Sequence, residues 1–148
     1  MPKLLKIGGF KVQNFELVHN VPNNAFIVDT YNGIRILYCT DTEYIPKKVK
    51  GVNYAIIECN HDTEYILDNA MNDSFSMSHY ENHQSLDNCI EYLKAIYSPS
   101  LQGVILWHLS DSNINESKAI KKVKKELGFD NIVCAKENLI IPLQKEEF

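Results

Sequence analysis

Short apolar runs separated by polar turn sequences dominate the chain and predict a mixed β-sheet with helices. The clearest run spans residues 34–44, where β-branched and aromatic residues without Gly or Pro indicate a strand buried on at least one face. The run stops at a Thr-Asp-Thr sequence, so Asp41 is expected at the end of this strand. Sheets hold the side chains at strand ends rigidly, and functional residues are common there.

Three other apolar strands are predicted to end in a residue that can bind a metal ion. These are Phe15–His19, Tyr54–Glu58 and Val104–His108. Together with Asp41 they place four His, Asp or Glu side chains at strand ends, which is the pattern of a metal site. Two structural alternatives stay open. A single His at a strand end is often a structural residue, and Asp41 could instead close an Asx turn.

The remaining pattern predicts a meander followed by alternating helices and strands. Asn32-Gly33 lies between two apolar runs and predicts a hairpin, so three strands open the chain. The apolar alternation changes phase at Gln13-Asn14, which indicates a bulge or bend. Helices are expected at 61–72, from Ser85 as N-cap to Tyr97, and at 115–128, with a long polar loop at 73–83 and short strands at 132–135 and 138–142.

Length and composition indicate one ordinary globular domain over residues 1–148. The apolar fraction is 45% and the charged fraction 23%, which argues against disorder. No apolar run approaches the ~20 residues that cross a bilayer, and the first residues do not form a secretory signal, so we expect a cytoplasmic protein without a membrane partner. The four cysteines are widely spaced and predict buried free thiols rather than a zinc knuckle or redox pair.

The formal net charge of −4 argues against a generally basic nucleic-acid-binding surface. The expected helix at 115–128 carries five lysines between positions 118 and 125, which leaves a local basic surface as an alternative. A solvated helix face is the simpler interpretation of these lysines.

The order of motifs resembles the second half of the metallo-β-lactamase fold. A strand ending in His is followed by a strand ending in Thr-Asp-Thr, a strand ending in Glu, a His-x-Ser before a helix, and a strand ending in His-x-Ser. The sequence is most similar to the phosphodiesterase and nuclease branch, which includes tRNase Z and small bacterial and phage proteins. The resemblance implies a mixed α/β sheet with helices on one face, forming half of an αββα sandwich.

The resemblance also implies a role for each matching residue. His19 would bind the first metal ion, Asp41 would bridge two ions and His108 would bind the second. His83 would be the substrate-side histidine that protonates the leaving oxygen or steadies the phosphate, although His79 competes for this position. Glu58 would assist catalysis by contacting the metal-binding residues without binding a metal ion itself. The implied cofactor is two zinc ions, with manganese nearly as suitable.

One departure from the family pattern changes the expected function. The family completes its metal sites with a His-x-His-x-Asp-His sequence, and the five histidines of this chain include no His-x-His. Each metal would keep two protein ligands instead of the usual three. We therefore expect a half-enzyme that needs a complementary chain, a second copy of itself or residues from a longer product to cleave nucleic-acid or nucleotide phosphodiesters. The alternative is a non-catalytic remnant that serves as a binding or dimerisation module.

Overall fold

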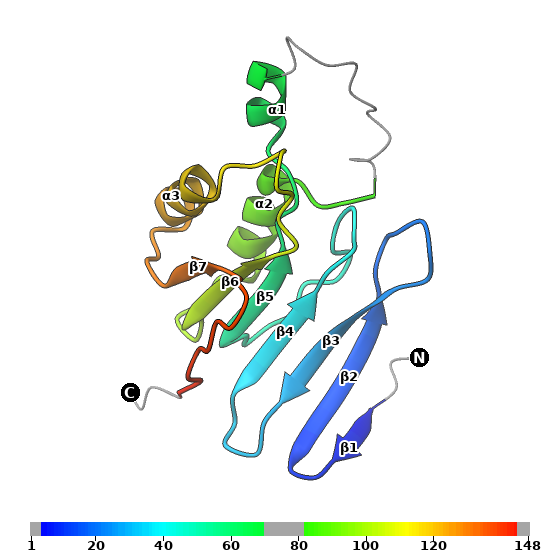
Figure 1. The fold of residues 1–148 in the computed structure, drawn as a ribbon. Helices are drawn as coiled ribbons and strands as arrows, with labels where there is room; N and C mark the ends of the chain where they lie inside the picture. Colours follow the sequence, from blue (N-terminus) through cyan, green and yellow to red (C-terminus); the bar gives the residue numbers. More distant parts are fainter. Residues whose placement is uncertain (1–3, 70–81, 145–148) are drawn as a thin grey trace.

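The computed structural model describes residues 4–69 and 82–144, which form one sheet and three helices (Figure 1). In chain order the elements are β1 (Leu5–Ile7), β2 (Phe10–Glu16), β3 (Asn24–Asp29), β4 (Arg35–Cys39), β5 (Tyr54–Glu58), α1 (Thr63–Asn69), α2 (Leu86–Ile96), β6 (Gly103–Trp107), α3 (Glu116–Leu127) and β7 (Ile132–Cys134).

The seven strands lie side by side in the order of the sequence. Strands β1 to β4 pair antiparallel, and β4 to β7 pair parallel. The antiparallel part is the expected meander with β1 added at its edge, and Asn32-Gly33 lies in the turn between β3 and β4. Parallel pairing places the carboxyl ends of β4, β5 and β6 at one edge of the sheet, where ligands bind in open α/β folds. The expected mixed α/β sheet is confirmed.

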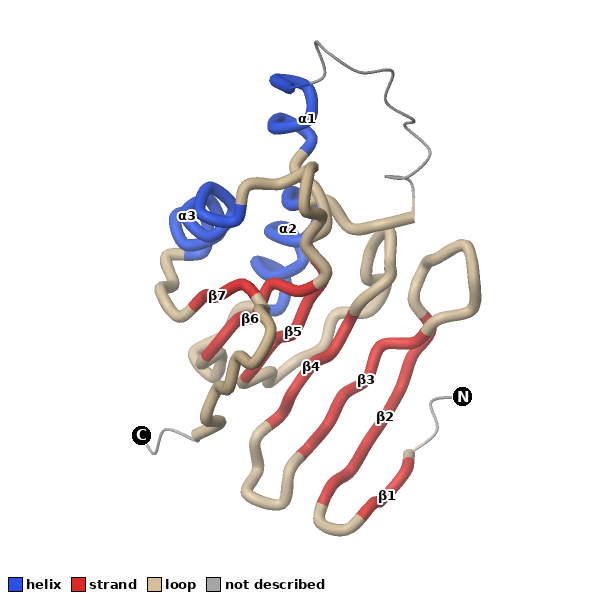
Figure 2. The backbone as a smooth tube through the Cα atoms, in the orientation of Figure 1, coloured by secondary structure: helices blue, strands red, loops and turns tan. Residues whose placement is uncertain are grey.

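The main core lies between the sheet and helices α2 and α3, which lie against one face of its parallel part, whereas α1 lies beyond the ends of the strands (Figure 2). The core-facing strand residues, such as Leu37, Ile57 and Leu106, are fully buried. Helix α2 adds Cys89 and Leu93, and α3 adds smaller residues to the same cluster. Burial of this apolar surface is the main driving force for folding.

The opposite face of the sheet also carries apolar side chains but is only partly covered. Phe26 on β3 and Trp107 on β6 are 41% and 40% exposed. Tyr38 on β4 contacts Trp107, with ring centroids 6.4 Å apart. Tyr38 is in register with Ile105 of β6 through Ile56 of β5, and Trp107 lies two residues after Ile105, so the Tyr38 and Trp107 side chains point to the same face. This face therefore exposes several large apolar side chains in a row, which is a common feature of interaction surfaces.

Three expectations about the strands are wrong, and two of them concern β2. Strand β2 pairs with β3 without a bulge at Gln13-Asn14, because apolar residues occupy both faces of the strand and the change of phase does not require an extra residue. Strand β2 ends at Glu16, so His19 follows the strand in a loop that Leu17 closes by donating to the carbonyl of Asn23.

The third concerns residues 138–142, where no strand forms. Asn138 has a φ of 62° and turns the chain, and Pro142 has no N–H for a strand ladder. The segment instead runs to Gln144, whose backbone makes two hydrogen bonds with the Tyr54 hydroxyl at 3.1 and 3.2 Å.

The helices follow their sequence signals. Ser85 caps α2 by accepting a hydrogen bond from the N–H of Asn88, and Asn115 caps α3 by accepting one from Lys118. Gly128 ends α3 in the left-handed conformation with a φ of 60°. Helix α1 begins at Thr63, and residues 70–72 of the helix expected there, with most of the 73–83 loop, lie outside the described residues.

All four cysteines are free and buried, as expected from their spacing. None of the helices in the described ranges is long and apolar enough to cross a membrane.

Candidate metal centre

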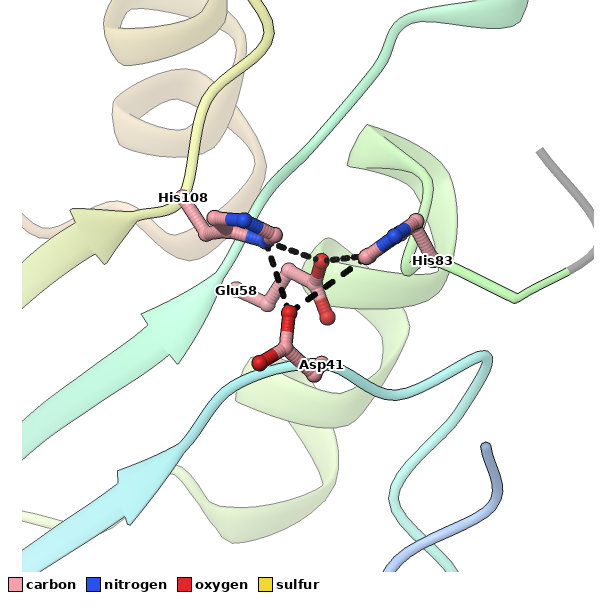
Figure 3. A group of neighbouring side chains, drawn as sticks. All are labelled: Asp41, Glu58, His83 and His108. Carbon is pink, nitrogen blue, oxygen red and sulfur yellow. Dashed lines mark hydrogen bonds and ion pairs between the residues drawn. The ribbon is translucent and has the colours of Figure 1, made fainter. Parts of the chain in front are cut away.

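A buried carboxylate lies at the centre of the site. Glu58, at the end of β5, is 0% exposed. Its Oε2 accepts a hydrogen bond from the backbone N–H of Thr42 at 2.7 Å. Its Oε1 lies 2.6 Å from Nδ1 of His83 and 2.9 Å from Nδ1 of His108 (Figure 3). A buried carboxylate is costly unless it is paired in this way, so its contacts fix the three chain segments around it.

Asp41 and His108 lie directly beyond the ends of the parallel strands β4 and β6. Both have a φ of 56°, in the left-handed region that non-glycine residues rarely adopt. Such strained conformations persist where the surrounding structure imposes them, and they concentrate at functional sites. Their effect here is to bring Oδ1 of Asp41 to 3.3 Å from Nδ1 of His108. The Asp41 side chain thus meets a histidine, as the ligand interpretation requires.

His83 reaches the site from the segment that precedes α2. The neighbouring Gln84 is 0% exposed and donates from its side chain to the backbone carbonyl of Glu58 at 3.0 Å. The N–H of Asn60 donates to the carbonyl of Gln84, which adds a backbone tie between the two segments. These contacts hold His83 with its Nδ1 4.0 Å from Oδ1 of Asp41. Sequence analysis did not single out Gln84, whose only signal was its place between His83 and Ser85.

Four side chains could together hold a metal ion. The ligand atoms of Asp41, Glu58, His83 and His108 all lie within 4.8 Å of one another. Carboxylate and imidazole suit zinc and manganese alike. Because Glu58 already accepts three hydrogen bonds, it is placed to orient the two imidazole rings. Asp41 and His108, which lie closer together than Asp41 and His83, are the better placed pair to hold an ion. The residues present therefore fit a divalent cation.

His19 lies beside this group without joining it. Its ring centroid is 5.3 Å from that of His83, and its Nδ1 is 2.9 Å from the backbone oxygen of Asn82. The structure thus brings together Asp41, Glu58, His83 and His108 and places His19 at the edge. The metal-binding role of His19, Asp41 and His108, and the catalytic role of His83, Asp41 and Glu58, stay predictions.

The other histidines are accounted for differently. His61 is buried, and its backbone carbonyl accepts a hydrogen bond from Leu86 at the start of α2. Burial, followed by the nearby charge of His83, lowers the pKa of His61, which favours a neutral structural residue. His79 lies outside the described residues. Near the site, burial and then the Asp41 carboxylate raise the pKa of Tyr38.

The surrounding loops are tied to the same edge of the sheet. Asn60 donates from its side chain to the carbonyl of His108 at 3.0 Å, and Ser110 donates from its backbone to Asn60. The N–H of Asp62 donates to the carbonyl of Asn113, whose side chain donates to the hydroxyl of Ser110. The loop after His108 is therefore held against the segment after β5, and the site has a fixed wall on this side.

No family model and no curated protein sequence matches the chain. Among solved structures, the metallo-β-lactamase fold protein YhfI from Bacillus subtilis has a TM-score of 0.67 and 17% identity, over 93% of this chain and 50% of that one. The short form of human tRNase Z has a TM-score of 0.62 and 16% identity, over 97% and 47% of the two chains.

Isothiocyanate hydrolase from Delia radicum gut bacteria is also similar, with a TM-score of 0.60 and 11% identity over 97% of this chain and 58% of that one. Two of these three proteins are named for hydrolytic or nuclease activities, and the likeness extends over nearly all of this chain. The chain therefore has the metallo-β-lactamase fold, over a stretch that spans about half the length of the solved proteins it matches.

Proposed function

We propose that the chain is the C-terminal half of a binuclear metal-dependent hydrolase that cleaves phosphodiesters. The observation that carries the proposal is the buried Glu58 carboxylate, which joins His83 and His108 beside Asp41 at the carboxyl ends of parallel strands. The fold, which is shared with tRNase Z and isothiocyanate hydrolase, supports a hydrolase. Fold alone does not assign an activity, so the proposal is built on the site.

Asp41 and His108 would hold a metal ion in this scheme, and His19 would serve the second ion. A divalent ion, when bound, lowers the pKa of a water molecule and neutralises charge on a phosphate oxygen. The carboxylate of Asp41 suits a shared position because it offers two oxygens. Zinc fits the His and Asp ligands, and manganese fits them nearly as well.

His83 would act as the proton donor to the leaving oxygen. Its Nδ1 faces the Glu58 carboxylate at 2.6 Å, so the hydrogen on Nδ1 is held there and Nε2 is the atom that can deliver a proton. Glu58 fixes the orientation of the ring through this contact, as a carboxylate does for a catalytic histidine. Glu58 would therefore act by positioning His83 and His108.

The proposal requires further ligands from outside the described residues. The sequence has no His-x-His, and in the described part of the chain the metal-ligand group contains two histidines and two carboxylates. A complementary chain that carries His-x-His-x-Asp-His, or a second copy of this chain, would complete the two sites. The partly covered sheet face around Phe26 offers such a partner an apolar surface.

A hydrolysis assay tests this function on the complex of the chain with its partner, purified from the organism that produces it. Hydrolysis of bis(4-nitrophenyl) phosphate should depend on added zinc or manganese and should fall by roughly 10²-fold or more in His83→Ala, which removes the general acid. The matched control is His61→Ala, since His61 is buried near the site but belongs to the scaffold. Equal activity of wild type and His83→Ala would reject the proposed role of His83, and no hydrolysis by the metal-loaded assembly would reject the phosphodiesterase.

The exposed sheet face favours a second candidate, a non-catalytic module that binds a partner or dimerises. Phe26 and Trp107 would then be covered in a stable assembly that holds no metal. Native mass spectrometry of wild type and Phe26→Glu separates the candidates. A metal-free homodimer that dissociates in the variant would support the module, whereas an assembly with metal and phosphodiesterase activity would support the enzyme.

A further inference from the structure

A cavity of about 460 Å³ opens beside the candidate metal centre. It lies between the ends of β6 and β7, the loop after β6 and the start of α3, and His108 forms part of its lining. A cavity of this size is within the range that holds small molecules or parts of them. The wall is fixed by hydrogen bonds, because Ala135 donates to the carbonyl of Leu106 at 2.8 Å and the loop after His108 is tied to Asn60 and Asp62.

The lining of the cavity has an apolar part that includes an aromatic residue. Trp107 is 40% exposed, and Leu109, Ile114 and Ala135 complete the apolar lining. Ile114 is buried. A partly exposed tryptophan in a small cavity offers a stacking surface, and base stacking on an aromatic side chain contributes substantially to nucleotide binding.

The charges around the cavity disfavour a phosphate and favour groups that donate hydrogen bonds. Asp111, Glu116 and Glu137 line the cavity with a single lysine, Lys136. Lys136 pairs with Glu116 at 3.1 Å, and within the described ranges Asp111 and Glu137 make no ion pair. Two carboxylates thus offer acceptor oxygens at the rim. Carboxylates accept hydrogen bonds from the exocyclic amino group of a base and repel the carbonyl that replaces it in uracil.

We propose that this cavity binds the base of a nucleotide substrate, with the ring on Trp107 and an exocyclic amino group toward Asp111 or Glu137. The inference rests on the proposed phosphodiesterase function and names its substrate class. The adjacency of His108 to both the cavity and the metal centre would place the phosphate of the same nucleotide at Asp41 and His108. A free cation fits less well, because one ring does not form a cage and Lys136 lies in the lining.

Trp107 is the single tryptophan of the chain, so its fluorescence reports on this cavity directly. The experiment titrates the full chain with cytidine and with uridine, neither of which carries a phosphate, and repeats the titration with the trinucleotides of each. Cytidine should quench the fluorescence at about tenfold lower concentration than uridine, as expected for one amino group read by a carboxylate. Because no metal or activity is needed, the result is independent of the catalytic proposal.

Variants test the assigned contacts. The Asp111→Asn, Glu137→Gln double variant should bind cytidine and uridine equally, and Asp130→Asn, an exposed residue outside the cavity lining, is the matched control that should keep the tenfold preference. Thermal unfolding by circular dichroism checks that each variant is folded. An unchanged preference in a folded double variant would overturn the role of the two carboxylates.

The outcomes separate this inference from the proposed function. Quenching by both free cytidine and its trinucleotide supports a site for a single nucleotide. Quenching by the trinucleotide but not by free cytidine supports a site for a base within a strand. Quenching by choline as strong as by cytidine would reveal a cation site and overturn the base assignment, as would no quenching by any base. Phosphodiester hydrolysis without base binding would keep the proposed function and reject this cavity as the base site, whereas base binding without hydrolysis would do the reverse.

Discussion

Replacement of Glu58 by alanine tests how the site is held together. The change removes the acceptor of three hydrogen bonds, from Thr42, His83 and His108. The side chain of His108 is 42% exposed and that of His83 is 25% exposed, so water can replace their lost partner. Water cannot reach the N–H of Thr42 in the same way, because Thr42 is buried.

The magnitude follows from this difference between the partners. An unsatisfied buried N–H costs ~1–3 kcal/mol. Removal of a buried charge recovers part of its desolvation penalty, whereas the small cavity that is left adds a cost of similar size. We expect Glu58→Ala to lower the free energy of unfolding by about 2 kcal/mol, which lowers the melting temperature by roughly 4–8 °C in a chain of this size.

Thermal unfolding followed by circular dichroism measures the effect. Glu16→Ala is the matched control, because Glu16 also ends a strand but is exposed. A melting temperature of Glu58→Ala that equals that of the control would refute the reasoning. Glu58→Gln should be within about 1 kcal/mol of wild type, since its amide oxygen can still accept from Thr42, but should lose roughly 10–100-fold in metal affinity because it no longer orients both rings.

Three further predictions concern stability and reactivity. At pH 8 Cys134 should react faster than Cys39 with an alkylating reagent, because burial raises the pKa of Cys134 to about 11 and that of Cys39 further. Mass spectrometry after partial alkylation measures the order, and a faster reaction of Cys39 would contradict it. Burial lowers the pKa of His61 below its ordinary value of 6.5, so the unfolded chain binds protons more readily and the free energy of unfolding should fall as the pH drops through about 6.5. Urea unfolding at pH 7.5 and 5.5 measures this fall, and an equal fall in wild type and His61→Gln would contradict the prediction. Asn115→Ala should lower the free energy of unfolding by about 1 kcal/mol, because it removes the side chain that caps α3, whereas the control Ser117→Ala, at an exposed position inside the same helix, should not. Urea unfolding measures both variants, and equal stability of the two would contradict a stabilising role of the Asn115 cap.

The sequence predicted the strands and helices where local chemistry determines them. The Asn32-Gly33 turn, the Ser85 and Asn115 caps and the Gly128 stop were all identified from residue type and position. The bulge at Gln13-Asn14 and the strand at 138–142 were wrong because apolar alternation does not show which face of a strand is covered, nor whether a neighbouring strand is available.

The candidate site was predicted in part for a related reason. Asp41, Glu58 and His108 lie at the ends of parallel strands, and parallel pairing brings such positions together at one edge of the sheet. The left-handed conformations of Asp41 and His108, the buried ties of Gln84 and the displacement of His19 depend on tertiary contacts that spacing along the chain does not encode.

Metal content measured together with native mass, for wild type and Asp41→Ala, tests the central claim most directly. The account predicts that the assembly purified from its own cells holds close to two divalent ions per site and that Asp41→Ala loses them without loss of fold. Asp130→Ala, an exposed aspartate far from this group in the sequence, should keep them. A metal-free assembly, or metal content unchanged in Asp41→Ala, would contradict the hydrolase and leave the scaffold module as the function of this chain.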